Sequence, residues 1–215
     1  MYKAKIIASH NCWASRISRE FPGHDLALNN TLWLEDKHAM DVFSVRAESD
    51  AQFDAILRYL RAEKTIARSE MLERGKTYMF VQVDTYSPQP IIRQVYNCHC
   101  FQLAPILLKS GNEIWTLGAV RRENLKKAFE AIKKLGSASL KFIAPTTYDK
   151  ILLTEKQRIA FNMATMMGYY ELPRKITVTK LAKAARVSKT AFLEHLRKAE
   201  IKILGSYAGS HDVAS

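Results

Sequence analysis

The sequence predicts an α+β protein in which a larger N-terminal α/β domain precedes an all-helical domain. Three observations support this. Strand-like and helix-like segments alternate over residues 1–147, a proline-containing linker follows, and the segment after it has only helical periodicity. The chain has 215 residues, 47% of them hydrophobic, which suffices for one good core or two domains. We expect domains at 1–147 and 148–206, followed by a flexible tail at 207–215.

Residues 1–73 have the order β-α-β-β-α-β. Short apolar or β-branched stretches predict strands at Lys5–Ala8, Thr31–Leu34, Val42–Val45 and Ile66–Leu72. A helix before the last strand has apolar residues at i, i+3, i+4 and i+7, which are Phe53, Ile56, Leu57 and Leu60. A weaker helix, with Trp13, Ile17 and Phe21 four residues apart, follows the first strand.

Residues 74–147 repeat this order. A strand, a helix, two strands, a helix and a strand are expected at Tyr78–Val83, Pro90–Tyr96, Phe101–Leu108, Glu113–Leu117, Leu125–Ile132 and Leu140–Ile143. The second strong helix again spaces its apolar residues at i, i+3, i+4 and i+7. The repeat predicts two tandem ferredoxin-like units, at about 1–73 and 74–147, either side by side or sharing one sheet.

A linker and a capped helix follow. Ala144-Pro145-Thr146-Thr147 is expected to end the last strand, because proline removes a ladder donor. Thr154 and Gln157 form a capping-box pattern that begins a helix. We expect its inward stripe to be Ile159, Met163 and Met167, and Gly168 to end it.

Two further helices are joined by a very short turn. Thr177 is expected to cap the first, and Ser188 to cap a second that ends near Leu204. Only Arg186 and Val187 lie between them, so the helices must cross steeply, as in a helix-turn-helix that offers its second helix to a DNA major groove. Val187 is expected to be buried inside the turn. Arg186 stands where positive φ is common, at a cost on the order of 1 kcal/mol.

The helix from Ser188 to Leu204 has two faces. Phe192, Leu196, Ala199 and Ile203 form its inward stripe. On the outward face, Lys189, Thr190 and Glu194 are expected to meet base edges, and Arg197 and Lys198 to hold phosphate. The complete set of expected DNA contacts is Arg174, Lys175, Thr177, Ser188, Lys189, Thr190, Leu193, Glu194, Arg197 and Lys198.

The helical segment closely resembles the helix-turn-helix domain of archaeal bacterio-opsin-activator-type regulators. The stretches that carry the likeness are Leu153-Thr154-Glu155-Lys156-Gln157, Gly168-Tyr169-Tyr170, Pro173-Arg174-Lys175, Val187-Ser188-Lys189-Thr190 and His195-Leu196-Arg197-Lys198-Ala199-Glu200. Ser9-His10-Asn11-Cys12-Trp13-Ala14-Ser15 and Phe21-Pro22-Gly23 look like the opening of archaeal members with an α/β input domain. The resemblance implies a transcription factor that binds promoter DNA. Arg186 departs from it, since related sequences often have Gly in the turn.

The charge favours a polyanionic partner. The net charge is +12, and residues 151–215 carry 11 Lys and Arg against 5 Asp and Glu, so the helical segment is the more basic part. Double-stranded DNA is the expected partner, and RNA bound by the ferredoxin-like units is the alternative. Because a single helix-turn-helix reads few base pairs, we also expect a homodimer formed by the N-terminal domain.

The N-terminal domain holds candidates for sensing. His10, Cys12 and Cys98-His99-Cys100 could converge as a thiol or soft-metal sensor, or the thiols could be buried and inert. Trp13, Trp33 and Trp115 could line a ligand cleft or pack in the core. A small-molecule or metal effector is therefore left open.

Other classes of protein are not favoured. There is no Gly-rich phosphate loop, helical metal-ligand pair or nucleophile elbow, so we expect neither an enzyme nor a bound cofactor. The N-terminus lacks a signal-peptide core, and no apolar run is long enough to span a bilayer. Three cysteines do not make a disulfide scaffold. The expected location is the cytoplasm.

Overall fold

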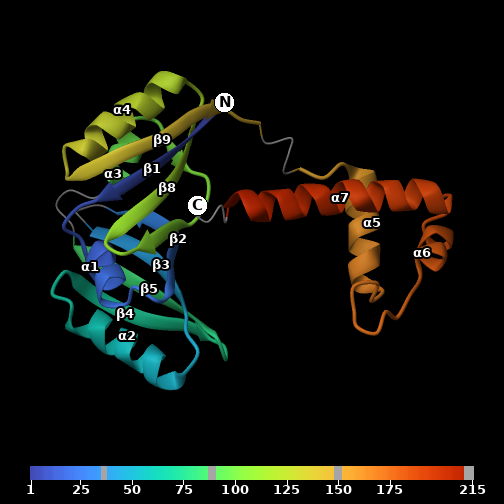
Figure 1. The fold of residues 1–215 in the computed structure, drawn as a ribbon, viewed down its shortest axis with the longest axis horizontal. Coiled ribbons are helices and arrows are strands. Elements are labelled where there is room, and N and C mark those ends of the chain that lie inside the picture. The colour runs from blue at the N-terminus through green and yellow to red at the C-terminus, as the bar shows by residue number, and fades with distance from the viewer. Residues whose placement is uncertain (35–37, 87–90, 148–151, 211–215) are drawn as a thin grey trace. The chain divides into compact units, whose positions relative to one another are not determined.

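The computed structural model describes residues 1–215 apart from 35–37, 87–90, 148–151 and 211–215. The chain divides into two compact units, Met1–Thr146 and Thr147–Ser215 (Figure 1). Among the helices of the described residues, none is both long enough and apolar enough to cross a membrane.

The N-terminal unit is built on one antiparallel sheet, which has nine strands in the described residues. In chain order the strands are β1 (Tyr2–Ser9), β2 (Asp25–Trp33), β3 (His38–Arg46), β4 (Ile66–Arg74), β5 (Tyr78–Tyr86), β6 (Phe101–Gln102), β7 (Ile106–Lys109), β8 (Asn112–Ala119) and β9 (Ser137–Pro145). Their order across the sheet is β4-β5-β3-β2-β7-β8-β1-β9, and β6 also pairs with β8.

One face of this sheet carries the core. The helices α1 (Trp13–Glu20), α2 (Asp50–Ala62), α3 (Ile91–Asn97) and α4 (Arg122–Lys133) bury side chains in the same apolar cluster as the strands. Cross-strand partners share a face, and the buried residues pair with one another, as in Phe43 with Val81 and Ile6 with Trp115. The helices therefore cover one side of the sheet, and the other side is left without helices in the described residues.

The topology does not confirm two consecutive ferredoxin-like units. Such a unit places its own first strand between its third and fourth strands. Here β5 lies between β3 and β4, where β1 would be expected, and β1 lies between β8 and β9, where β5 would be expected. The two halves thus form a single sheet in which their first strands are exchanged.

Most predicted elements of this unit are present with longer bounds, but two predictions need correction. The strand expected over Phe101–Leu108 is divided into β6 and β7, because Pro105 cannot donate to a ladder. The last strand does not end at Ala144 but includes Pro145, which is tolerated because β9 lies at the sheet edge.

The C-terminal unit contains α5 (Glu155–Met166), α6 (Val178–Ala184) and α7 (Lys189–Ser210). The predicted capping box begins α5: Gln157 N donates to Thr154 Oγ1, and Thr154 N donates to Gln157 Oε1. Gly168, just beyond α5, has a φ of 76°, the left-handed geometry expected where a helix ends.

The predicted inward stripe of α5 is wrong at two of its three positions. Ile159 and Met167 are 45% and 40% exposed, whereas Met163 packs against the core cluster of this unit. The buried residues of α5 in that cluster are Ala160 and Ala164, which join Leu181, Ala182, Phe192 and Leu196. Small alanines let α5 lie close to α7, so Ile159 and Met167 point outward.

The last helix is longer than predicted. We expected it to end near Leu204, but α7 continues to Ser210, so residues 207–210 of the expected tail are helical. No proline follows Leu204, and a glycine such as Gly205 weakens a helix without ending it. Residues 211–215 of the expected tail lie outside the described residues.

The strand exchange predicts how fragments of the N-terminal unit behave. Residues 1–74 and residues 75–147 should each lack cooperative urea unfolding alone, because each lacks the strand that lies inside its half of the sheet. An equimolar mixture should recover the circular dichroism signal and the single transition of fragment 1–147. A cooperative transition in fragment 1–74 alone would contradict the exchanged arrangement.

Candidate nucleic-acid interface

The junction of α6 and α7 has the geometry expected of a helix-turn-helix. Lys180 N donates to Thr177 Oγ1 (3.4 Å) at the start of α6, and Ala191 N donates to Ser188 Oγ (3.1 Å) at the start of α7. Both predicted caps are therefore present. Val187 N donates to Ala182 O (3.1 Å), which closes the turn tightly. The two helices consequently cross steeply rather than lie antiparallel (Figure 1).

Of the two turn residues, Arg186 agrees with its prediction and Val187 does not. Arg186 has a φ of 55°, the left-handed conformation predicted for its position. Val187 was expected to be buried, but it is 44% exposed, because the space beneath the turn is filled by other side chains. Those side chains are Leu181, Ala182 and Phe192.

The predicted faces of α7 are present at its start. Phe192, Leu196 and Ala199 are buried, and Ile203 is half-buried at the far end of the same stripe. The outward residues Lys189, Thr190, Glu194, Arg197 and Lys198 are exposed, and Leu193 is half-buried. The first turns of α7 therefore present polar side chains on the side away from the core of the unit.

Several of the predicted contact residues interact with a neighbour within the unit. Lys198 Nζ donates to Glu194 Oε1 (2.6 Å), and this bond lowers the pKa of the Glu194 carboxyl. Lys175 Nζ lies 2.5 Å from Glu171 Oε2. The Arg174 guanidinium lies 4.6 Å from the centre of the Tyr169 ring, a cation–π contact that holds it beside the start of α6.

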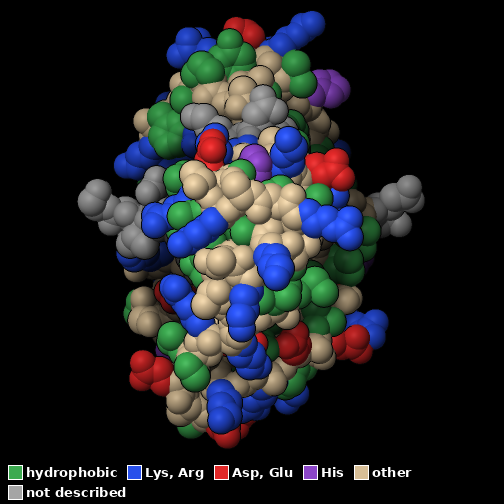
Figure 2. Space-filling model, turned by 90° about the vertical axis from the view of Figure 1, so that its right-hand side faces the viewer, with side chains coloured by type: hydrophobic (Ala, Val, Ile, Leu, Met, Phe, Trp, Pro, Cys, Tyr) green, Lys and Arg blue, Asp and Glu red, His purple; other side chains and the backbone are tan. Residues whose placement is uncertain are grey.

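Three cations that were not predicted as part of the interface lead along α6 and the turn to Lys189, which was predicted. Lys180, Lys183 and Arg186 follow one another at intervals of three residues along α6 and the turn, and Lys189 continues the spacing. All four are exposed, and none forms an ion pair with a carboxylate in the part of the chain that the structure describes. Figure 2 shows blue Lys and Arg side chains gathered on the face in view. The three-residue spacing was the sequence signal for these cations.

Two family models match the chain. One, described as an HTH DNA binding domain, matches residues 153–205. The other, an N-terminal domain named HVO_2525_N, matches residues 5–138, which is more than half of the chain. The chain belongs to the HVO_2525_N family. Its C-terminal unit carries a helix-turn-helix DNA-binding domain of the bacterio-opsin-activator type, as the resemblance implied.

Two curated relatives come from Haloferax volcanii. The chain is 34% identical over 90 residues to "Transcriptional regulator NarO", covering 38% of this chain and 40% of the relative. It is 42% identical over 57 residues to "Dimethyl sulfoxide reductase transcriptional activator", covering 26% of this chain and 27% of the relative. The chain thus spans less than half the length of either relative.

In this HVO_2525_N-family chain, two of the proposed sensing residues meet at a buried carboxylate. His10 Nε2 lies 3.0 Å from Glu113 Oε1, and Cys12 Sγ donates to the same oxygen at 2.8 Å. Trp115 Nε1 donates to Glu113 Oε2 at 2.9 Å. Burial opposes ionisation of Glu113, but the contacts with His10, Cys12 and Trp115 outweigh it and lower the pKa of this carboxyl.

This cluster has the donor set of a small metal site, since the ligand atoms of His10, Cys12 and Glu113 all lie within 4.8 Å of one another. Burial, and then the charge of Glu113, raise the pKa of the Cys12 thiol, which disfavours a reactive thiolate. In the described residues, Cys98, His99 and Cys100 do not join the cluster. Cys100 is instead buried in the apolar core.

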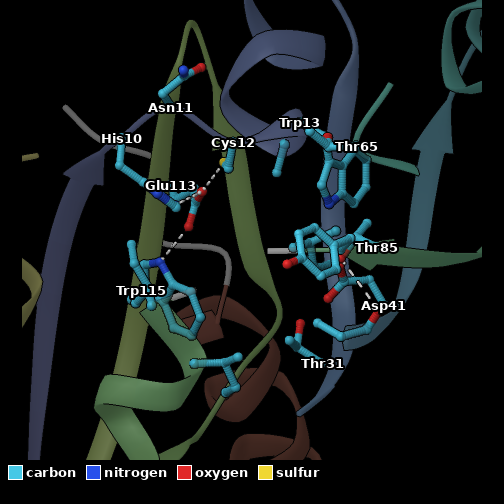
Figure 3. A pocket seen from close by; sticks show the side chains of 16 residues that line it. His10, Asn11, Cys12, Trp13, Thr31, Asp41, Thr65, Thr85, Glu113 and Trp115 are labelled. Carbon is cyan, nitrogen blue, oxygen red and sulfur yellow. Dashed lines mark hydrogen bonds and ion pairs between the residues drawn. The ribbon is translucent and has the colours of Figure 1, made fainter. Parts of the chain in front are cut away.

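The cluster forms one wall of a cavity of about 100 Å³ (Figure 3). Thr31, Asp41 and Thr85 lie on the facing wall, with Trp13 and Trp115 also in the lining. Trp33 is not among the lining residues, so two of the three tryptophans considered for a cleft are found there.

The acidic residues of this cavity, Asp41 and Glu113, were not predicted from the sequence. Asp41 is in phase with Ala39, Phe43 and Val45 on β3, all of which point into the core. Glu113 is similarly in phase with the buried Trp115 on β8. A carboxylate at an inward position of a strand is the signal that could have identified both.

Substitutions of Arg186 test whether its left-handed backbone conformation destabilises the C-terminal unit. Arg186→Gly should raise the free energy of unfolding of the C-terminal unit by about 0.5–1 kcal/mol, because glycine adopts positive φ without a Cβ clash. Arg186→Asn, which also tolerates this conformation, should act in the same direction. Urea titration measures the change, and Lys183→Asn is the control outside the left-handed region. A loss of stability in Arg186→Gly would show that the arginine side chain supports the turn.

Proposed function

We propose that this chain is a sequence-specific transcriptional regulator that places the first turns of α7 in the major groove of duplex DNA. The observation that carries the proposal is the steep α6–α7 crossing, which leaves the outward side of α7 exposed beside unpaired cations. Both curated relatives are named for such a role, one as a transcriptional regulator and the other as a transcriptional activator, which supports the proposal.

Base recognition is assigned to the exposed residues at the start of α7. Lys189 suits the acceptors of guanine, Thr190 suits a thymine methyl group, and Glu194 suits the amino group of cytosine. The bond from Lys198 lowers the pKa of the Glu194 carboxyl, and a carboxylate can only accept hydrogen bonds from a base. Leu193, half-buried between these positions, adds an apolar contact.

Phosphate binding is assigned to cations on both sides of α7. Arg174 and Lys175 precede α6, and Lys180, Lys183 and Arg186 extend this group along α6, the helix that crosses the DNA backbone in such motifs. Arg197 forms no ion pair with a carboxylate among the described residues, whereas Lys198 shares its charge with Glu194. The Thr177 and Ser188 hydroxyls cap their helices and retain a proton for a phosphate oxygen.

We also propose that the N-terminal unit forms a homodimer. A single helix-turn-helix reads few base pairs, and a twofold dimer presents two of them one helical turn apart. The uncovered face of the sheet offers an apolar surface: Ile7, Ile114, Leu107 and Ala27 are successive cross-strand partners on β1, β8, β7 and β2. An effector that binds the N-terminal unit is also part of this proposal.

Glu194 tests base recognition. In a selection from random duplexes, Glu194→Ala should relax the preference for cytosine at one base pair by about 1–3 kcal/mol, while nonspecific affinity stays equal or rises because a negative charge is removed. Glu200→Ala is the matched control, since Glu200 lies on the same helix but accepts a hydrogen bond from Tyr170 Oη. The same selected motif for both variants and the unmodified chain would remove Glu194 from the interface.

Sedimentation tests the dimer. The full chain and fragment 1–147 should both sediment as dimers, and fragment 149–215 as a monomer with weaker DNA affinity. Leu107→Lys should shift the full chain toward monomer, because it places a charge on the proposed apolar surface. A monomeric fragment 1–147 beside a dimeric fragment 149–215 would instead place the dimer interface in the DNA-binding unit.

A further inference from the structure

The cavity of the N-terminal unit is large enough for a ligand. Its volume is about 100 Å³, and one water needs roughly 10–15 Å³ on this measure, so the space suits a molecule of about seven non-hydrogen atoms. Much of its lining is apolar or aromatic, with Trp13, Trp115, Leu28, Ile91 and Ile92 contributing. Apolar walls with a few converging polar groups are typical of small-molecule sites.

One carboxylate oxygen of Asp41 is buried in this cavity without a hydrogen-bond partner among the described residues. The residue is 4% exposed, and the oxygen concerned is Oδ1. Burying a carboxylate oxygen without a donor is costly, so its retention here needs a reason. Burial, reinforced by the charge of Glu113, raises the pKa of Asp41 to about 7.

Thr31 supplies a second unpartnered group beside it. Thr31 is the cross-strand partner of Asp41, and its Oγ1 is also buried without a hydrogen-bond partner among the described residues. A register shift between Leu28 and Asn30 in β2 changes the alternation, so that Thr31 rather than Asn30 is buried. Bulges of this kind re-aim side chains next to functional sites.

The charged groups that line the cavity indicate which kinds of ligand it can bind. Asp41 and Glu113 occupy facing walls, so an anion would be repelled (Figure 3). Glu113 already receives Cys12 Sγ–H and Trp115 Nε1–H, which leaves Asp41 and Thr31 as the groups that lack a donor. A hard metal ion would need several oxygen ligands, whereas much of the lining near Asp41 is apolar.

We propose that this cavity binds a small organic ammonium compound, with its N–H groups donating to Asp41 and Thr31 and its apolar part packed against Trp13 and Trp115. Aromatic rings beside a carboxylate stabilise such a cation by cation–π and charge-assisted contacts together. Because every lining residue belongs to the N-terminal unit, the site can be tested without DNA.

Tryptophan fluorescence gives a direct readout. The chain has three tryptophans, so Trp33→Phe leaves only Trp13 and Trp115, both in the cavity lining. The full chain with this substitution is titrated with isobutylamine, isobutanol and isobutyrate at pH 8, where the amine is charged. The expected result is saturable binding of the amine, about tenfold or more weaker binding of the alcohol, and none of the carboxylate.

Charge variants complete the test. Asp41→Asn should weaken amine binding about tenfold or more without lowering the melting temperature, because it removes a buried charge and keeps the side-chain shape. Asp84→Asn, a carboxylate on neighbouring β5 that is not in the cavity lining, should leave binding unchanged. Equal binding of amine and alcohol, an unaffected Asp41→Asn, or saturation by zinc chloride but not by amine would each overturn the proposal.

Discussion

The N-terminal unit depends on the exchange of β1 and β5 between its two halves. Each of these strands lies inside the sheet, bonded on both sides to strands of the opposite half. Neither half can therefore complete its hydrogen-bond ladder or its apolar face alone. A single core results, and it contains Ile6 from β1 and Val81 from β5.

The same exchange assembles the cavity from distant parts of the chain. The segment His10–Ala14 follows β1 and lies beside Glu113 and Trp115 of β8, whereas Thr85 lies at the far end of β5 next to β3 and Asp41. A ligand there would contact both halves at once. Its binding would thus be sensitive to how the exchanged strands fit together.

At each proposed functional site, one residue adopts a conformation or an environment that is unfavourable for its type. Arg186 occupies a left-handed conformation that glycine would adopt at lower cost, yet it puts a cation at the turn beside the proposed DNA surface. Asp41 puts an unpartnered carboxylate oxygen into an otherwise apolar face of β3. Conflicts between local preference and the fold are expected at functional positions, where another interaction compensates for them.

Local patterns predicted most of the elements and the exposed face of α7. Capping residues and a 100° periodicity act within a few residues, so Thr154, Thr177 and Ser188 could be placed from the sequence alone. Strand exchange is different, because β1 and β5 have similar apolar patterns and only their distant partners decide which half each joins. The inward face of α5 was missed because alanines, rather than Ile159 and Met167, make the close contact with the core.

The functional residues could likewise be predicted only where they depend on local patterns and not on pairing between distant strands. The outward residues of α7 can be predicted from helix geometry. Thr31, in contrast, points into the core only because of a register shift in β2, which no pattern in the sequence predicts. Asp41 and Glu113 were visible as acidic residues at inward strand positions, but their approach to one cavity depends on pairing across the whole sheet. The separation of Cys98 and Cys100 from Cys12 is likewise a property of the tertiary fold.

Sequencing of the nucleic acids crosslinked to the full chain in its own cells tests whether α7 reads the sequence of duplex DNA. If α7 does so, the recovered nucleic acids should be duplex fragments from promoter regions that share a short motif, repeated as two half-sites about 34–36 Å apart. Recovery of RNA, or of DNA fragments without a common motif, would show that α7 does not read duplex sequence.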